Sequence, residues 1–342
     1  MSDLLKVAVI GASGYTGEEL LRVLLQHPHV SLTAITSRQL AGQSLNKVLG
    51  PLADSANLAF ENLSPEEVST RAEVFFLALP HGVAAEYAVP LIKAGKTVFD
   101  LSADFRLKNP VKYLEYYHAE HPAPELLAQA VYGSPELYRA SLVEAQLIAC
   151  PGCYPTSTIL GLAPALKHGL VKLNTIIVNS LSGVSGAGKK ADALYSFCER
   201  DENVMPYSVP RHRHIPEIEQ ELSLLAGEAV TISFTPHLVP LIRGMLTTTV
   251  AEMTKPLTND QVQKLYEDFY QHEHFVKVLG QDQLPETKRV MRTNYIEVSV
   301  RCDARTGRIF FFTAQDNLGK GAATQAVQAF NVRFGLKEST GL

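Results

Sequence analysis

The sequence is poor in cysteine, in excess positive charge and in long apolar runs. Four cysteines in 342 residues are too few for a disulfide framework, so we expect a reduced, cytoplasmic protein. Lys and Arg number 31 against 35 Asp and Glu, a net charge of -4, whereas proteins that neutralise nucleic-acid phosphates are usually basic. The longest apolar runs, such as residues 74–79, are far too short to span a bilayer. We therefore expect neither nucleic acid nor membrane among its partners.

The composition nevertheless supports a large folded core. Apolar residues make up 46% and charged residues 19% of the chain, which excludes disorder as the main state. The amino-terminal residues lack the charged start and apolar stretch of a secretion signal. At roughly 150 residues per domain the length predicts two domains.

The first half of the chain predicts a doubly wound parallel sheet of the Rossmann type. Short apolar runs alternate with helical patterns, and this alternation implies parallel strands joined by right-handed crossovers. The expected strands are residues 6–10, 30–36, 73–79, 96–101 and 146–150. The expected helices between them are residues 15–26 and 83–94.

The second half predicts an α+β domain with a mainly antiparallel sheet. Strands follow one another with few helices between them, a pattern typical of antiparallel pairing. The expected strands are residues 174–180, 229–235, 245–253, 295–301 and 308–314, and the expected helices are residues 190–199, 217–226 and 258–272. An amphipathic stretch, 319–334, closes the chain. We place the domains at 1–150, completed by the helix at 317–342, and at 151–316.

A glycine-rich motif follows the first expected strand and opens the first expected helix. Glycines in such a turn let the backbone approach a pyrophosphate, which the helix N-terminus then holds. The context favours a dinucleotide site over a plain turn. The motif supplies these candidate cofactor residues: Gly11, Ser13, Gly14, Tyr15, Thr16 and Gly17.

The end of the second strand favours NADP(H) over NAD(H). Enzymes that use NAD often carry an acid there, for the ribose hydroxyls. Here Ser37 and Arg38 follow the strand, and no acid comes before Asp54. A hydroxyl and an arginine suit a 2′-phosphate, although Arg38 could also be a solvated loop residue.

The motif CPGCYPT at 150–156 places Cys153 at the start of an expected helix. That position lowers a thiol pKa and raises the thiolate fraction. A redox pair with Cys150 and a zinc site remain alternatives, and an inert buried thiol is the usual reading. We apply the inert reading to Cys198 and Cys302, and we expect Cys150, at a strand end, to be structural.

Two further groups of residues could serve a reaction. His212 and His214 lie in RHRHIPE at 211–217, and a histidine can act as general acid or base near neutral pH. These histidines with the cysteines could form zinc ligands, but the spacing matches no common finger and we expect no metal. The loops 100–106 and 182–188 both follow strands, and Arg106 in the first could clamp a phosphate or carboxylate.

Taken together, the motifs resemble the N-acetyl-gamma-glutamyl-phosphate reductase family over nearly the whole chain. The segments that carry the resemblance are GASGYTG (11–17), LALPHG (77–82), DLSADFR (100–106), ACPGCYPT (149–156), SGVSGAGKK (182–190), HRHIPEIEQ (212–220), TPHLVPLIRGM (235–245) and DNLGKGAA (316–323). PGCYPT and HRHIPEI are specific to this family, whereas aspartate-semialdehyde dehydrogenase and many others share the glycine turn.

The resemblance implies NADPH-dependent reduction of N-acetyl-glutamyl phosphate to the semialdehyde, through a cysteine thioester, in arginine synthesis. It implies Cys153 as nucleophile and His214 as acid/base. It implies that the carboxyl-terminal helix returns to the Rossmann domain and that the chain forms a homodimer or homotetramer. Further cofactor residues implied are Pro80, Ser182, Gly183, Ser185, Gly186 and Asn317. Substrate residues implied are Ser102, Arg106, Arg211 and Glu217.

Two other functions compete with this one. The first is reduction of a carrier-bound aminoadipyl phosphate in lysine synthesis, which shares the fold and the chemistry; an acidic carrier would favour a basic surface, and the net charge of -4 gives it no support. The second is a nucleotide-sensing Rossmann protein without turnover, which the presence of both Cys153 and His214 disfavours.

Overall fold

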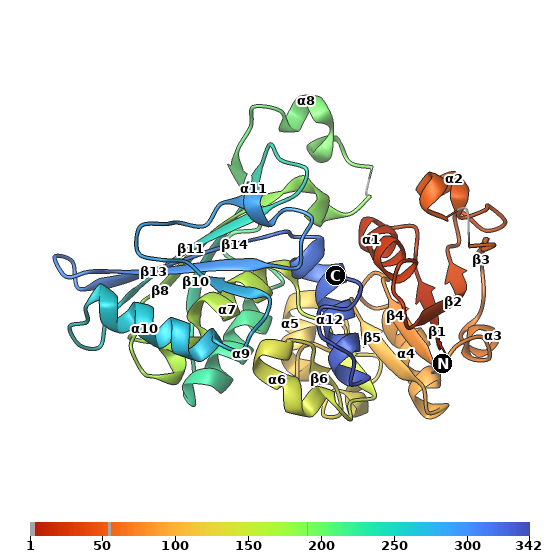
Figure 1. Ribbon diagram of the computed structural model, residues 1–342, viewed down its shortest axis with the longest axis horizontal. Coiled ribbons are helices and arrows are strands. Elements are labelled where there is room, and N and C mark those ends of the chain that lie inside the picture. The colour runs from red at the N-terminus through yellow and green to blue at the C-terminus, as the bar shows by residue number, and fades with distance from the viewer. Residues whose placement is uncertain (1–3, 54–55, 190) are drawn as a thin grey trace. The chain divides into compact units, whose positions relative to one another are not determined.

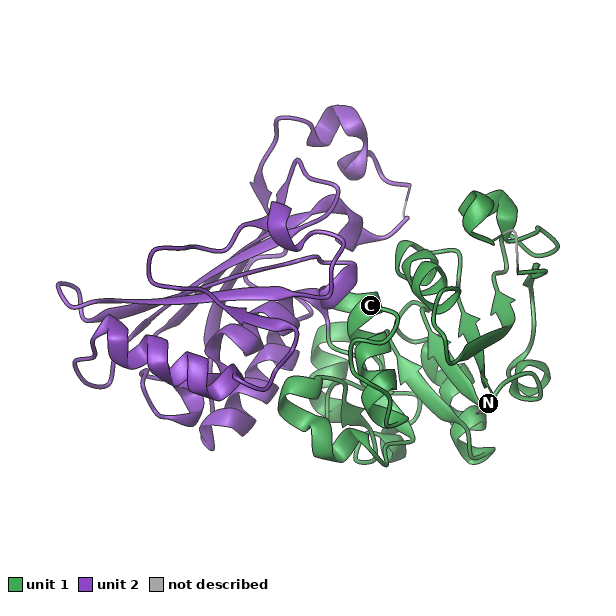
Figure 2. Cartoon of the chain, in the orientation of Figure 1, with its two compact units in different colours: residues 1–151, 322–342 green, residues 152–321 purple. Residues whose placement is uncertain are grey.

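The computed structural model describes residues 4–53, 56–189 and 191–342. The chain forms two compact units, each described by itself (Figures 1 and 2). Unit 1 is Met1–Pro151 with Ala322–Leu342, and unit 2 is Gly152–Gly321. Among the described residues, no helix has the length and apolar character needed to cross a bilayer.

Unit 1 is built on a seven-stranded sheet with the order β3-β2-β1-β4-β5-β7-β6. All of its strand pairs are parallel, which confirms the predicted Rossmann-type sheet. The strand order reverses beside β1, and ligands of such sheets bind at the carboxyl ends of the strands there. The strands are β1 (Leu5–Ile10), β2 (Val30–Thr36), β3 (Phe60–Glu61), β4 (Val74–Leu77), β5 (Thr97–Asp100), β6 (Val131–Tyr132) and β7 (Leu147–Ala149).

The helices of unit 1 include the three that were expected, α1, α4 and the carboxyl-terminal α12, and several that were not. The longer unexpected ones, α5 and α6, each start with a proline, which is well suited to a first turn because its missing N–H has no helical partner there. The helices are α1 (Tyr15–Leu24), α2 (Asn46–Leu49), α3 (Pro65–Ser69), α4 (Ala84–Lys93), α5 (Pro110–Tyr117), α6 (Pro135–Leu142) and α12 (Thr324–Arg333), with 3₁₀ turns at Gly50–Ala53 and Pro124–Leu126.

The sheet of unit 1 has an apolar layer on each face, which explains its continuous apolar strands. In β1, Val7 and Val9 belong to one layer, while Ala8 and Ile10 belong to the other. The side chains of α12, including Val327, join the layer that contains Val7 and Val9. The carboxyl-terminal helix therefore completes the core of unit 1.

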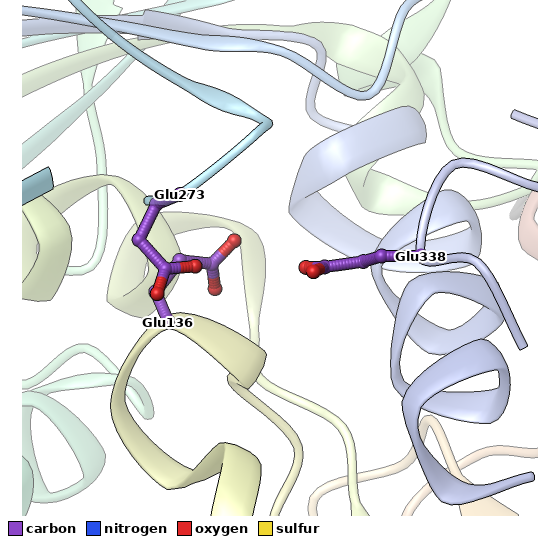
Figure 3. Close-up of side chains that lie close together, drawn as sticks. All are labelled: Glu136, Glu273 and Glu338. Carbon is purple, nitrogen blue, oxygen red and sulfur yellow. The ribbon is translucent and has the colours of Figure 1, made fainter. Parts of the chain in front are cut away.

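A buried polar contact ties the chain after α12 to α6. The carboxylates of Glu136 and Glu338 point toward one another (Figure 3). Gln328 Nε2 donates to both, at 2.8 Å and 2.6 Å, and Arg139 pairs with Glu338 at 2.6 Å. The amide and the guanidinium offset the repulsion between the two acids.

Unit 2 contains a second seven-stranded sheet, with the order β12-β13-β14-β11-β8-β10-β9. Most pairs are antiparallel, as predicted, whereas β8–β10 and β12–β13 are parallel. The strands are β8 (Ile176–Gly183), β9 (Met205–Pro206), β10 (Ile232–Val239), β11 (Met245–Glu252), β12 (Val276–Val278), β13 (Ile296–Asp303) and β14 (Arg308–Gln315).

Helices α7, α9 and α10 lie on one face of this sheet (Figure 1). Burial alternates along β8, β10 and β11. Every second side chain of these strands is directed to the opposite face of the sheet, and most of those side chains are partly exposed. The helices of unit 2 are α7 (Cys153–Lys167), α8 (Phe197–Arg200), α9 (Ile215–Ala226), α10 (Asn259–Tyr270) and α11 (Thr287–Val290). Shorter turns occupy Val184–Ala187 and Ala193–Tyr195, and a π-helical turn occupies Gly319–Ala323.

The helix expected at 190–199 is wrong. Lys190 lies outside the described residues, and the rest forms the turn Ala193–Tyr195 and the single-turn helix α8. Ser196 between them is extended, with φ -67° and ψ 152°. A run of exposed residues there, among them Phe197 at 79% exposure, lacks the packed face that stabilises a longer helix.

Candidate active site

The glycine turn of unit 1 has the close backbone contacts that a phosphate-binding turn requires. Gly11 has φ +78°, and a Cβ there would lie 2.5 Å from the Ala78 carbonyl oxygen. A Cβ on Gly17 would lie 2.7 Å from the Cα of Ala12. Gly14 caps α1, and a Cβ there would meet only the Gly11 oxygen, at 4.0 Å. The turn therefore packs α1 tightly onto β1 while the start of α1 stays accessible to an anion.

The end of β2 is joined to this turn by hydroxyl groups. The Thr36 hydroxyl accepts the Gly11 N–H at 3.2 Å, and the Ser37 hydroxyl donates to that of Ser13 at 2.9 Å. Arg38 is exposed directly after Ser37. Ser37, Arg38 and the glycine turn thus lie together at the carboxyl ends of β1 and β2. Tyr15 and Pro80 are exposed as well, whereas Asp54 lies outside the described residues.

The loop after β5 forms a buried polar network. Ser102 donates its N–H and its hydroxyl to Asp100, each at 2.9 Å, and accepts the Asp104 N–H at 3.0 Å. Asp104 in turn accepts from Tyr113 and from the Gly82 N–H. Burial, together with the Asp104 carboxylate, raises the pKa of Asp100 to about 7.

Arg106 is buried at the end of this network. Its Nε donates to the Cys150 carbonyl and its Nη2 to the Leu101 carbonyl, both at 2.8 Å. These bonds join the ends of β5 and β7. The predicted clamp on a substrate anion stays a prediction, and the same holds for Ser102, whose described bonds also go to the protein.

Cys153 is the first residue of α7, as the sequence predicts. Gly152 caps the helix, and its N–H donates to Glu217 Oε1 at 2.9 Å. Glu217 lies in the first turn of α9 and is 1% exposed. This bond ties the start of α7 to the start of α9, so Glu217, predicted to bind substrate, also holds the backbone beside the nucleophile.

His212 and His214 lie in the turn that precedes α9. The His214 N–H donates to His212 Nδ1 at 3.1 Å, so the neutral His212 ring carries its proton on Nε2. Burial and the nearby Arg213 cation lower the pKa of His212 to about 4. The Tyr154 ring packs edge-on against both, with centroids 5.4 Å from His212 and 5.8 Å from His214. Tyr154 follows Cys153 in the chain, so these rings gather at the start of α7, and Arg211, next to His212 in the chain, is exposed.

The loop after β8 meets the segment after β14. Asn317 accepts the Gly244 N–H at 2.9 Å and donates to the Ser185 hydroxyl at 3.0 Å. A Cβ on Gly183 would lie 2.8 Å from the Ile242 carbonyl, and one on Gly186 would lie 3.7 Å from the Ser182 hydroxyl. The four loop residues predicted near the cofactor and Asn317 therefore lie in one region of unit 2.

Sequence reasoning missed three polar residues of this region. Asp316 is fully buried and pairs with Arg243 Nε at 2.9 Å, and it also accepts the Leu318 and Gly319 N–H groups. Gln315 donates to the Cys153 carbonyl. The sequence signals were the positions of Arg243 within TPHLVPLIRGM and of Asp316 within DNLGKGAA.

The remaining cysteines differ from Cys153 in their surroundings. All four are free thiols. Cys150 is 1% exposed, and burial with the Asp100 carboxylate raises its thiol pKa. Burial also raises the pKa of Cys302, whereas Cys198 is exposed in α8. A raised thiol pKa suits the structural role predicted for Cys150.

Known proteins match the chain along nearly its whole length. Residues 6–145 match the family model described as "Semialdehyde dehydrogenase, NAD binding domain", and residues 153–317 match "Semialdehyde dehydrogenase, dimerisation domain". A Geotalea daltonii protein named N-acetyl-gamma-glutamyl-phosphate reductase is 50% identical over 340 residues, 99% of this chain and 98% of that protein. One of the same name from Acetivibrio thermocellus is 46% identical over 336 residues, 98% of this chain and 97% of that protein.

Solved structures share the fold at lower identity. Aspartate semialdehyde dehydrogenase II from Vibrio cholerae, complexed with ASA, has a TM-score of 0.74 at 19% identity, and covers 97% of this chain and 98% of its own. Aspartate semialdehyde dehydrogenase with NADP from Candida albicans has a TM-score of 0.71 at 17% identity, and covers 96% and 98%. By the extent and identity of the sequence matches, the chain belongs to the semialdehyde dehydrogenase family and, within it, to the N-acetyl-gamma-glutamyl-phosphate reductases.

Proposed function

We propose that this protein reduces N-acetyl-gamma-glutamyl phosphate to N-acetyl-glutamate semialdehyde and phosphate in arginine synthesis, with NADPH as reductant and Cys153 as nucleophile. The observation that carries the proposal is the position of Cys153 as the first residue of α7, beside the histidine turn. The names of the full-length relatives supply the substrate class.

Cys153 supplies the covalent step. Its thiolate, favoured by the start of α7, attacks the acyl carbon, the C–O bond to phosphate breaks, and a thioester remains on the enzyme. A thioester accepts hydride far better than a carboxylate does, which is the reason for covalent catalysis here. A bound nicotinamide supplies that hydride. The N–H groups at the start of α7 are suited to stabilise the oxyanion that develops.

His214 handles the proton at the substrate oxygen. After reduction of the thioester, its imidazolium donates a proton to the oxygen of the thiohemiacetal, and it takes the proton back as the C–S bond breaks. The semialdehyde and the Cys153 thiolate are then released. His212 is neutral near pH 7, because its pKa is lowered to about 4. It therefore orients the turn without competing for the proton.

Unit 1 has groups that fit the cofactor. The glycine turn and the start of α1 fit the pyrophosphate, and Ser37 with the exposed Arg38 fits a 2′-phosphate. The description of residues 6–145 as an NAD binding domain supports a nicotinamide cofactor, and NADP(H) is our more specific proposal. Within unit 2, the loop that contains Ser182 and Ser185, with Asn317, is assigned to the nicotinamide end.

Arg106, Ser102, Arg211 and Glu217 remain the proposed substrate residues. Arg211 is exposed at the edge of the histidine cluster, where an anionic substrate can reach it. Arg106 and Glu217 are buried and hydrogen-bonded to backbone. We therefore assign direct contact first to Arg211. We further propose a cytoplasmic homodimer or homotetramer, supported by the four free thiols and by the family description of unit 2.

The decisive assay is phosphate-dependent oxidation of N-acetyl-glutamate semialdehyde, followed at the nicotinamide absorbance. We expect turnover with NADP⁺ that requires phosphate or arsenate. His214→Asn should slow it by about 10²–10⁴-fold. Cofactor binding without turnover would instead identify a nucleotide-sensing protein, and activity confined to carrier-linked aminoadipyl substrates would identify the lysine-pathway alternative.

A further inference from the structure

The last residue of β14 is bonded to the backbone of the nucleophile. Gln315 is fully buried, and its Nε2 donates to the Cys153 carbonyl at 2.8 Å. In a regular helix this carbonyl already accepts from the residue one turn later. The bond from Gln315 is therefore an additional tie between the sheet and the first turn of α7.

The π-helical turn after β14 packs against the same residue. A Cβ on Gly321 would lie 2.8 Å from the Cys153 Cβ and 3.2 Å from Gln315 Nε2. The Gly321 N–H donates to the Asp316 carbonyl at 2.9 Å. Gly321 thus packs against both Gln315 and the Cys153 Cβ, and residue 321 has no room for a side chain.

Packing alone does not account for an amide at this position. Among the described residues Gln315 Oε1 is buried and has no hydrogen-bond partner. A buried polar atom without a partner is costly, and leucine or methionine would fill similar volume without that cost. Leucine or methionine at position 315 could not donate the hydrogen bond that Gln315 Nε2 makes to the Cys153 carbonyl.

We propose that Gln315 is a positioning residue for the Cys153 nucleophile, and that it does so by fixing the first turn of α7 against the end of β14. The proposal rests on the proposed role of Cys153. The helix start acts on the thiol through N–H groups whose direction depends on the geometry of that turn. Loss of the tie lets the turn relax, which weakens stabilisation of the thiolate and misplaces the sulfur.

Gln263 provides a matched control in the same unit. It is buried in α10, and its Nε2 donates to the Leu279 carbonyl at 3.0 Å and to the Glu267 carboxylate at 2.8 Å. Its Oε1 is also unpartnered among the described residues, and neither of its bonds involves Cys153. Gln263→Leu therefore reports the general effect of removing a buried glutamine whose Nε2 is hydrogen-bonded and whose Oε1 is not.

The test compares Gln315→Met and Gln315→Leu with Gln263→Leu in the full-length enzyme. The rate of Cys153 alkylation by iodoacetamide is measured against pH without substrate, with peptide mapping to identify the labelled thiol. We expect the midpoint to move up by about half a pH unit in both Gln315 variants, with kcat reduced by roughly 10- to 100-fold and KM changed by less than about two-fold. Gln263→Leu should match the wild type in alkylation midpoint, kcat and KM.

An unchanged alkylation midpoint in folded Gln315 variants would overturn the proposal. So would failure of both variants to fold by circular dichroism, because Gln315 would then be structural. The alkylation profile needs no substrate. An inactive wild-type enzyme would thus refute the proposed function, while the midpoint shift would still report on the role of Gln315.

Discussion

At the scale of single residues, the four cysteines separate by their local surroundings. Cys153 begins a helix beside an imidazole cluster, whereas Cys150 is buried beside Asp100, where its thiol pKa is raised. A thiol that is held protonated is a poor nucleophile. The same residue type therefore has opposite expected reactivity three positions apart.

Cys153→Ser should lower kcat by about three orders of magnitude or more, because a hydroxyl without a dedicated base attacks poorly. Cys150→Ser should keep most of the activity. Steady-state assays, with cofactor binding measured by fluorescence titration as a folding control, check both variants. Equal loss in the two would replace the thioester mechanism by a redox pair or a metal site.

Arg38→Ala should weaken NADP(H) binding by roughly 10-fold, since a charge-assisted bond to a 2′-phosphate is lost. NAD(H) binding should change by less than about two-fold. Isothermal titration with both cofactors measures the difference. A similar loss of affinity for NADP(H) and NAD(H) would show that Arg38 is a solvated loop residue that does not bind the 2′-phosphate.

At the scale of elements, loops at strand ends carry the polar groups, and their networks hold the strands together. The loop after β5 carries Asp100, whose pKa is raised to about 7 by burial and by Asp104. Its carboxyl is therefore protonated in the folded state at a pH where it is ionised in the unfolded chain. The folded state then binds more protons, so this group's contribution to stability is full below the unfolded pKa of 3.8 and is lost as pH rises through about 7.

Asp100→Asn should remove this pH dependence. An amide accepts the Ser102 N–H and donates to the Ser102 hydroxyl, so the network geometry is kept. Between about pH 4 and 7 the wild type should lose free energy of unfolding with a slope of up to about 1.4 kcal/mol per pH unit relative to the variant, and the difference should level off above pH 7. Urea denaturation across that range measures the difference. Parallel curves for the two proteins would show that Asp100 titrates normally.

At the scale of the whole molecule, the second sheet has one face that α7, α9 and α10 do not cover (Figure 1). Ile177 on the inner strand β8 is 45% exposed there, and Val250 pairs with it from β11. Exposed apolar side chains that neighbour one another on a sheet face are found at subunit interfaces. The description of unit 2 as a dimerisation domain supports a second copy as its partner.

Ile177→Lys should shift the oligomer toward the mass of a single chain, because it would place a charge without a partner in a buried interface. Leu224→Lys is the control, since Leu224 is 63% exposed but lies on α9. Size-exclusion chromatography with light scattering reports the mass. An unchanged mass in Ile177→Lys would locate the interface elsewhere.

Much of the fold and the central residues of the candidate site could be predicted from the sequence. Apolar runs such as β1, and the glycine turn before α1, are local signals, and they identified the Rossmann-type sheet. Cys153 at a helix start was predicted in the same way, from Pro155, which suits a first helical turn, and from the apolar helical pattern after it. Short edge strands such as β6 and proline-initiated helices such as α5 carry weaker local signals and were missed.

Only the tertiary structure decided which distant polar groups pair. Gln315 reaches the Cys153 carbonyl across 162 positions of sequence, and Glu217 reaches Gly152 across 65. Arg106 could be read from the sequence as an anion clamp, but its guanidinium donates to the Cys150 and Leu101 carbonyls. The physical reason is that hydrophobic periodicity and turn chemistry act over a few residues. Hydrogen bonds between buried polar groups depend instead on strand order and helix packing, which bring remote segments within 3 Å.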